Sequence, residues 1–135
     1  MEKLLSAVIC VLNSQYIHSS LAPWCLLAGT DSYCKSGINV KVTEGTINEK
    51  IENVASRIIK QNPKVIGFSC YIWNITETIE LLTLIKSKLP NAVIILGGPE
   101  VSYNAEEILK KHELVDYVIS GEGEKPFALL LNAIY

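Results

Sequence analysis

The sequence lacks any apolar run long enough to cross a membrane, and it lacks a concentration of positive charge. Runs such as Ala7–Leu12 and Ala92–Leu96 are far shorter than the roughly 18 residues that a membrane span needs. The N-terminus has one lysine and no cleavage-like segment, so no signal peptide is predicted. The net charge of −2 argues against nucleic acid as a partner. We therefore expect a cytoplasmic protein that binds neither nucleic acid nor membranes.

Motifs that hold metals, phosphates or dinucleotides are also missing. The cysteines Cys10, Cys25, Cys34 and Cys70 form no C-x-x-C pair and no Cys/His pair at zinc spacing, so no metal site is expected. There is no G-x-x-x-x-G-K-[ST], no G-x-G-x-x-G after the first strand, and no recognisable nucleophile–base pair. We therefore predict no catalytic residue. Cys10 and Cys70 lie in apolar runs and are expected to be buried thiols.

What is present is an alternation of strand and helix patterns along 135 residues, of which 49% are hydrophobic and 19% charged. This length and composition suit one domain with a single core. The predicted strands are Leu4–Leu12, Ile38–Thr43, Lys64–Cys70, Ala92–Leu96 and Asp116–Ser120. The predicted helices are Ser19–Lys35, three segments opened by the capping patterns Thr46-x-x-Glu49, Asn74-x-x-Glu77 and Asn104-x-x-Glu107, and a last helix from Pro126.

This order predicts an α/β fold. Because every connection contains a helix, the sheet should be parallel with helices on both faces. The size indicates a flavodoxin-like doubly wound five-stranded sheet of order 2-1-3-4-5, with residues 1–135 as one domain. Ligands bind such sheets beyond the carboxyl ends of the strands, at the switch point between the first and third strands. The informative segments are therefore the four loops 13–20, 69–74, 97–100 and 121–124.

Two of these loops are rich in glycine. The segment Gly97-Gly98-Pro99-Glu100 follows a buried strand, where paired glycines either let a ligand approach closely or only form a tight turn. The segment Gly121-Glu122-Gly123-Glu124 allows a sharp bend. Its glutamates either accept hydrogen bonds from a ligand or belong to a solvated turn before a helix. Both readings stay open at each loop.

The other two loops carry polar and aromatic side chains. Ser69 stands at a strand tip, where its hydroxyl either meets a ligand or caps the next helix, and Trp73 either walls a pocket or packs. The long first loop, with Asn13, Ser14 and Tyr16, is expected to contact a ligand because it lies at the switch point. His18 in that loop is either a ligand or a surface or capping residue.

The four loops together form a pattern that covers essentially the whole chain. It consists of Leu12-Asn13-Ser14-x-Tyr16-x-His18-Ser19-Ser20-Leu21-Ala22, Ile66-Gly67-Phe68-Ser69-Cys70-Tyr71-x-Trp73-Asn74, Leu96-Gly97-Gly98-Pro99-Glu100 and Asp116-Tyr117-Val118-x-x-Gly121-Glu122-Gly123-Glu124. This pattern resembles the cobalamin-binding domain that precedes the catalytic domain in B12-dependent radical S-adenosylmethionine proteins.

The resemblance implies a corrin ring over the carboxyl edge of the sheet. The dimethylbenzimidazole tail would run beside the strands that bear Ser69 and the Gly97-Gly98 pair, while the loop 13–18 would face the underside of the ring. The implied cofactor-binding residues are Asn13, Ser14, Tyr16, His18, Ser69, Cys70, Tyr71, Trp73, Gly97, Gly98, Pro99, Glu100, Gly121, Glu122 and Gly123.

Two departures from the family pattern refine this expectation. The cobalt-ligating motif Asp-x-His-x-x-Gly does not match at His18, because Tyr16 and Leu21 stand at its other positions. We therefore expect base-off cobalamin without a histidine ligand, with Tyr16 or water at the lower face.

The motif C-x-x-x-C-x-x-C, which holds the radical-generating iron–sulfur cluster in that family, is absent from the sequence. The resemblance then implies that S-adenosylmethionine and the iron–sulfur cluster belong to a missing radical-generating domain, in cis or in trans. The end at Tyr135 favours a fragment of a longer protein.

The predicted function is that of a cobalamin-binding module of a radical S-adenosylmethionine methyltransferase. The module would hold methylcobalamin for methyl transfer to a substrate radical and would have no turnover alone. The alternative is a flavin- or nucleotide-binding module on the same fold, which Ser14, Ser19 and Ser20 leave open. A third possibility is an interaction domain without a ligand, which would leave the double glycines and the long first loop unexplained.

Overall fold

A computed structural model describes residues 5–13, 22–34, 37–121 and 124–135. Within them lies a five-stranded parallel sheet of order β2-β1-β3-β4-β5, as the sequence predicts. The strands are β1 (Leu5–Asn13), β2 (Ile38–Thr46), β3 (Val65–Ser69), β4 (Val93–Gly97) and β5 (Tyr117–Val118). The helices are α1 (Ala22–Tyr33), α2 (Ile51–Ile59), α3 (Ile75–Lys88), α4 (Ala105–Lys111) and α5 (Glu124–Ile134).

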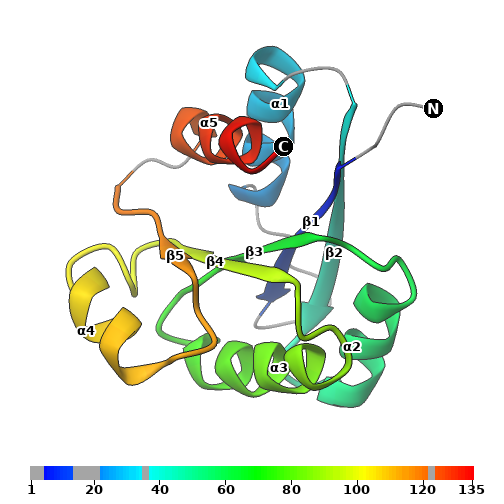
Figure 1. Cartoon of the computed structure of the whole chain (residues 1–135). Coiled ribbons are helices and arrows are strands. Elements are labelled where there is room, and N and C mark those ends of the chain that lie inside the picture. The colour runs from blue at the N-terminus through cyan, green and yellow to red at the C-terminus, as the bar shows by residue number, and fades with distance from the viewer. Residues whose placement is uncertain (1–4, 14–21, 35–36, 122–123) are drawn as a thin grey trace.

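The helices cover both faces of the sheet, so each face has its own core. Figure 1 shows α1 and α5 on one side of the strands and α2 and α3 on the other. Central strands are apolar on both faces, as doubly covered parallel strands must be. On the α2–α3 side, β1 and β3 contribute Val8, Cys10, Leu12, Ile66 and Phe68. On the α1–α5 side, they contribute Leu5, Ala7, Ile9 and Val65, which pack with Phe127 and Leu131 of α5.

Several predicted boundaries differ from the structure. β2 does not end at Thr43 but continues to Thr46, because Glu44, Gly45 and Thr46 stay in register with the end of β1. Asn13, predicted in a loop, is the last residue of β1 for the same reason. β5 is reduced to Tyr117–Val118, and α5 begins at Glu124, ahead of Pro126. The predicted ends of the first helix, at Ser19 and Lys35, lie outside the described residues.

The predicted capping patterns locate two helix starts correctly, but the expected side-chain capping hydrogen bonds do not form. Asn74 and Asn104 do precede α3 and α4, but neither side chain makes a capping hydrogen bond. Thr46 is not a cap at all: α2 begins at Ile51, after Lys50. Of that predicted box, only the contact from the Thr46 N–H to Glu49 Oε1 forms, at 3.4 Å. Within the described residues, only the Asn74 side chain of these three has a long-range hydrogen bond instead of a local cap, to Leu12 O at 3.0 Å.

None of the helices that the structure describes combines the length and apolar character needed to cross a bilayer. The cytoplasmic location expected from the sequence stays a prediction.

Candidate functional site

The carboxyl ends of β1, β3 and β4 form the rim where a doubly wound sheet binds its ligands. β1 has β2 on one side and β3 on the other, and the next described helices, α1 and α3, lie on opposite faces of the sheet (Figure 1). In folds of this class such a reversal leaves a crevice between the two strand tips. The candidate site is built from the loops that begin there.

Small residues line one face of the sheet at this rim. The register places Val11 beside Ser69 and Ser69 beside Gly97 across three neighbouring strands. Paired residues of a parallel sheet point to the same face, and alternation puts this set on the face of Gly67, which packs against Phe127 of α5. Ser69 is only 6% exposed. The nearest atom to a side chain built at Gly97 is the Ile119 carbonyl oxygen, 3.9 Å away.

The neighbouring glycine has a different reason to be there. Gly98 has φ +103°, and a Cβ at this position would stand 2.5 Å from the Cys70 carbonyl oxygen. The loop is fastened to the β3 tip on both sides, because Cys70 N–H donates to Gly97 O (2.7 Å) and Glu100 N–H donates to Cys70 O (3.2 Å). The tight-turn interpretation therefore accounts for Gly98, while nothing in the described protein requires glycine at position 97.

An aromatic platform stands on the loop after β3. The rings of Tyr71 and Trp73 are stacked, with centroids 4.4 Å apart and planes 7° from parallel. Trp73 is 44% exposed, and Ile72 between the two is more exposed still. Burial raises the pKa of the Tyr71 phenol, and the neighbouring Cys70 adds to this shift. The platform is thus a flat, uncharged surface that opens to solvent at the rim.

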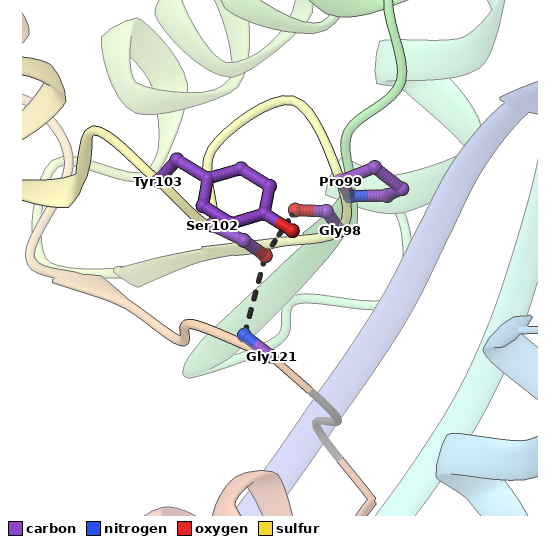
Figure 2. Close-up of a pocket in the computed structure, with 5 residues that line it drawn as sticks. All are labelled: Gly98, Pro99, Ser102, Tyr103 and Gly121. Atoms are coloured by element: carbon purple, nitrogen blue, oxygen red, sulfur yellow. Dashed lines mark hydrogen bonds between the residues drawn. The ribbon is translucent and has the colours of Figure 1, made fainter.

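A pocket of about 380 Å³ lies between the loops after β4 and β5 (Figure 2). Ser102 holds the two loops together, because its hydroxyl donates to Gly98 O (2.8 Å) and accepts from Gly121 N–H (3.2 Å). Tyr103 stands almost fully exposed beside it. Sequence reasoning missed Ser102 and Tyr103, because they lie between a predicted strand and a predicted helix with no motif of their own.

Other predicted residues fall into two groups. Asn13 is buried at the end of β1, and its Nδ2 lies 3.5 Å from Glu44 Oε1. Pro99 is exposed and Glu100 half-buried in the loop after β4. The predicted ligand contacts that lie outside the described residues are Ser14, Tyr16, His18, Glu122 and Gly123.

The buried thiols are inert in this arrangement. Cys10 and Cys70 are fully buried, as the sequence predicts. Burial raises the pKa of each thiol to about 12, so neither is a nucleophile at neutral pH. In the described part of the chain, no three His, Cys, Asp or Glu side chains gather as metal ligands.

The described structure defines a flavodoxin-like domain, a class of fold in which ligands bind at the switch point. Comparison with known families makes the assignment specific: the B12 binding domain model matches residues 9–131, and the chain belongs to this family. The comparisons give no support to the flavin or nucleotide alternative.

Relatives among characterised proteins are much longer than this chain. It is 35% identical over 81 residues to "Cobalamin-dependent radical SAM methyltransferase TokK" of Streptomyces tokunonensis, covering 60% of this chain and 12% of that protein. It is 29% identical over 133 residues to "Hopanoid C-3 methylase" of Methylococcus capsulatus, covering 94% of this chain and 26% of that protein.

Solved structures share the fold. A cobalamin-binding protein from Desulfitobacterium hafniense superposes with a TM-score of 0.73 at 12% identity, over 98% of this chain and 60% of that one. The radical S-adenosylmethionine methyltransferase TsrM of Kitasatospora setae, with cobalamin and a [4Fe-4S] cluster bound, superposes with a TM-score of 0.71 at 20% identity. The superposition covers 96% of this chain and 26% of TsrM.

Proposed function

We propose that this chain is the cobalamin-binding module of a radical S-adenosylmethionine methyltransferase and that it holds base-off methylcobalamin. Membership of the B12 binding domain family supports the cofactor. The similarity to the methyltransferase TokK and to hopanoid C-3 methylase supports the methyltransferase class. When bound, methylcobalamin supplies a transferable methyl group, and the protein supplies binding and orientation.

The lack of crowding at Gly97 is the observation that carries this proposal. A planar aromatic base needs a flat, uncrowded surface, and Gly97 offers one because, among the described residues beyond its chain neighbours, no atom would approach a Cβ at this position closer than 3.9 Å. Ser69, in register beside it, brings a hydroxyl that can donate to a ring nitrogen. Both residues fit the dimethylbenzimidazole tail of cobalamin, which would lie between the sheet and the α1–α5 layer.

The corrin ring itself would lie over the rim. The Tyr71–Trp73 platform and Pro99 present apolar surface there, which suits the edge of a large planar macrocycle. His18 lies outside the described residues, and the cobalt-ligating motif Asp-x-His-x-x-Gly does not match there, because Tyr16 and Leu21 stand at its other positions. This mismatch supports a cobalamin whose own base is displaced and not replaced by a histidine.

The proposed partner is a radical-generating domain that carries S-adenosylmethionine and an iron–sulfur cluster, in cis or in trans. TsrM, whose structure contains cobalamin and a [4Fe-4S] cluster, supports this pairing. The described residues of this chain gather no ligand set for such a cluster. The module itself would bind the corrin and orient it toward the partner domain.

Two substitutions test the tail site. Ser69→Ala removes the hydroxyl, and Gly97→Val fills the space where the base would lie. We expect each to weaken methylcobalamin binding by about tenfold or more, while urea unfolding shows an intact fold. Ser87→Ala, an exposed serine near the far end of α3, is the matched control and should bind normally. Unchanged affinity in both site variants would overturn the proposed placement of the tail.

A further inference from the structure

The side chain of Asn74 does something other than cap α3. Asn74 is completely buried, and its Nδ2 donates to two carbonyl oxygens, Leu12 O at 3.0 Å and Ser69 O at 3.1 Å. Its Oδ1 accepts from the Tyr71 N–H at 2.8 Å. One carboxamide thus contacts the tip of β1, the tip of β3 and the loop that carries the aromatic platform.

These contacts begin where the sheet stops. Val11 and Ser69 are the last paired residues of β1 and β3. The next two N–H groups after β3 do not bond to β1. Cys70 N–H donates to Gly97 O of β4, and Tyr71 N–H donates to Asn74 Oδ1. The carboxamide therefore bridges the ends of the two strands: it donates to Leu12 O of β1 and to Ser69 O of β3, and it accepts from Tyr71 N–H just after β3. These hydrogen bonds link the two strand ends to each other and to the loop that carries the platform.

Asparagine is the side chain that meets all three demands. A carboxylate accepts but cannot donate, and an apolar side chain would leave the buried Leu12 and Ser69 carbonyls without this partner. A helix cap alone would not explain the choice, because the side chain makes no capping hydrogen bond. The backbone of Asn74 already serves the helix, accepting from Thr78 N–H at 2.8 Å.

We propose that Asn74 is a positioning residue that sets the opening of the switch point and the orientation of the Tyr71–Trp73 platform, and thereby the affinity and seating of the corrinoid. This proposal rests on the proposed function. It adds a role for a residue that touches no ligand and acts through Leu12, Ser69 and Tyr71.

Asn74→Asp and Asn74→Gln test the proposal. Aspartate keeps an acceptor for Tyr71 N–H but cannot donate to Leu12 O or Ser69 O. Glutamine keeps the whole carboxamide but adds one methylene group, which displaces it from these three partners. We expect both to raise the Kd for methylcobalamin by about tenfold or more at neutral pH. We also expect an altered near-ultraviolet circular dichroism of the free protein, because the stacked rings shift. Binding by Asn74→Asp should partly recover in acid, since a protonated carboxyl group can donate to one carbonyl.

Ile85→Ala is the control for stability alone. Ile85 is fully buried on α3, far along the helix from Asn74, and its truncation should lower stability but leave Kd and aromatic dichroism unchanged. A folded sample of one of the two Asn74 variants is enough to test the positioning role. A wild-type Kd and wild-type aromatic dichroism in that variant would overturn this role. Failure of the wild-type chain to bind any corrinoid would instead overturn the proposed function.

Discussion

At the scale of single residues, neighbouring glycines in this site serve different purposes. Gly98 is needed by the fold, because its positive φ and the Cys70 backbone leave no room for a side chain. A Cβ at Gly97 would make only an ordinary contact with Ile119 O, so no described neighbour requires glycine there. A paired-glycine motif can therefore combine a glycine that the turn requires with one that it does not, and only the backbone geometry distinguishes them.

Substitution of each glycine by alanine should separate the two roles. Gly98→Ala should lower the free energy of unfolding by at least about 2 kcal/mol, because the left-handed backbone and the clash with Cys70 add. Gly97→Ala should change it by less than about 0.5 kcal/mol. Urea denaturation of the ligand-free protein measures both. Equal destabilisation by the two substitutions would contradict this division of roles.

The buried thiols predict an alkaline loss of stability. Folding raises the pKa of Cys10 and Cys70 from the ordinary value of 9.0 to about 12, so the folded state holds these protons more tightly than the unfolded chain. The protonated thiols make their full contribution to the free energy of unfolding below pH 9, and this contribution is lost as the pH rises toward 12. Urea unfolding between about pH 8 and about pH 10.5 measures this loss. Above pH 9 the free energy of unfolding should fall by up to about 1.4 kcal/mol per pH unit for each thiol.

A double variant isolates this effect from other alkaline titrations. Cys10→Ala/Cys70→Ala should be less stable at neutral pH but should show a flatter alkaline profile. An identical slope in wild type and variant would rule the thiols out as its cause.

At the scale of elements, the connection from β2 to α2 shows how tertiary structure overrides a local signal. Thr46 continues the ladder with β1, and the turn that follows is closed by Arg57, which contacts Glu49 and donates to Glu44 O at 3.0 Å. The hydrogen bond from Arg57 lowers the pKa of Glu49. The Thr46 hydroxyl is buried and has no hydrogen-bond partner among the described residues.

Thr46→Val should therefore be neutral or stabilising by up to about 1 kcal/mol, because it removes an unpaired buried hydroxyl. A capping threonine would instead cost about 1 kcal/mol when lost. Thr43→Val is the matched control on the same strand, because Thr43 Oγ1 accepts from Gln61 Nε2 at 3.0 Å and its loss should destabilise. Thermal unfolding of the two variants compares them directly, and a destabilised Thr46→Val would restore the capping interpretation.

The same elements show what a sequence can and cannot predict. The order of strands and helices follows from apolar runs and capping patterns, and the sheet order follows from helical crossovers. The end of β2 and the true partners of Asn74 do not follow, since both depend on a strand tip far away in the sequence. The local pattern predicted the starts of α3 and α4, but a long-range hydrogen bond to Leu12 O decides the role of the Asn74 side chain.

At the scale of the whole molecule, the switch point of the sheet predicts where the ligand lies, and the loops there account for most candidate residues. Ser69, Tyr71, Trp73 and Gly97 come together at one rim as expected from parallel strands. The bridge made by Ser102 between two loops was not predictable, because its partners Gly98 and Gly121 meet only in the fold. Their roles toward cobalamin stay predictions.

The most direct test of the central claim is a visible-absorption titration of the purified chain with methylcobalamin and hydroxocobalamin, with flavin mononucleotide as the control. The account predicts saturable binding of both corrinoids and a shift of the methylcobalamin band toward the base-off form, with no binding of the flavin. Tight flavin binding without cobalamin binding would contradict the account, as would a chain that binds neither.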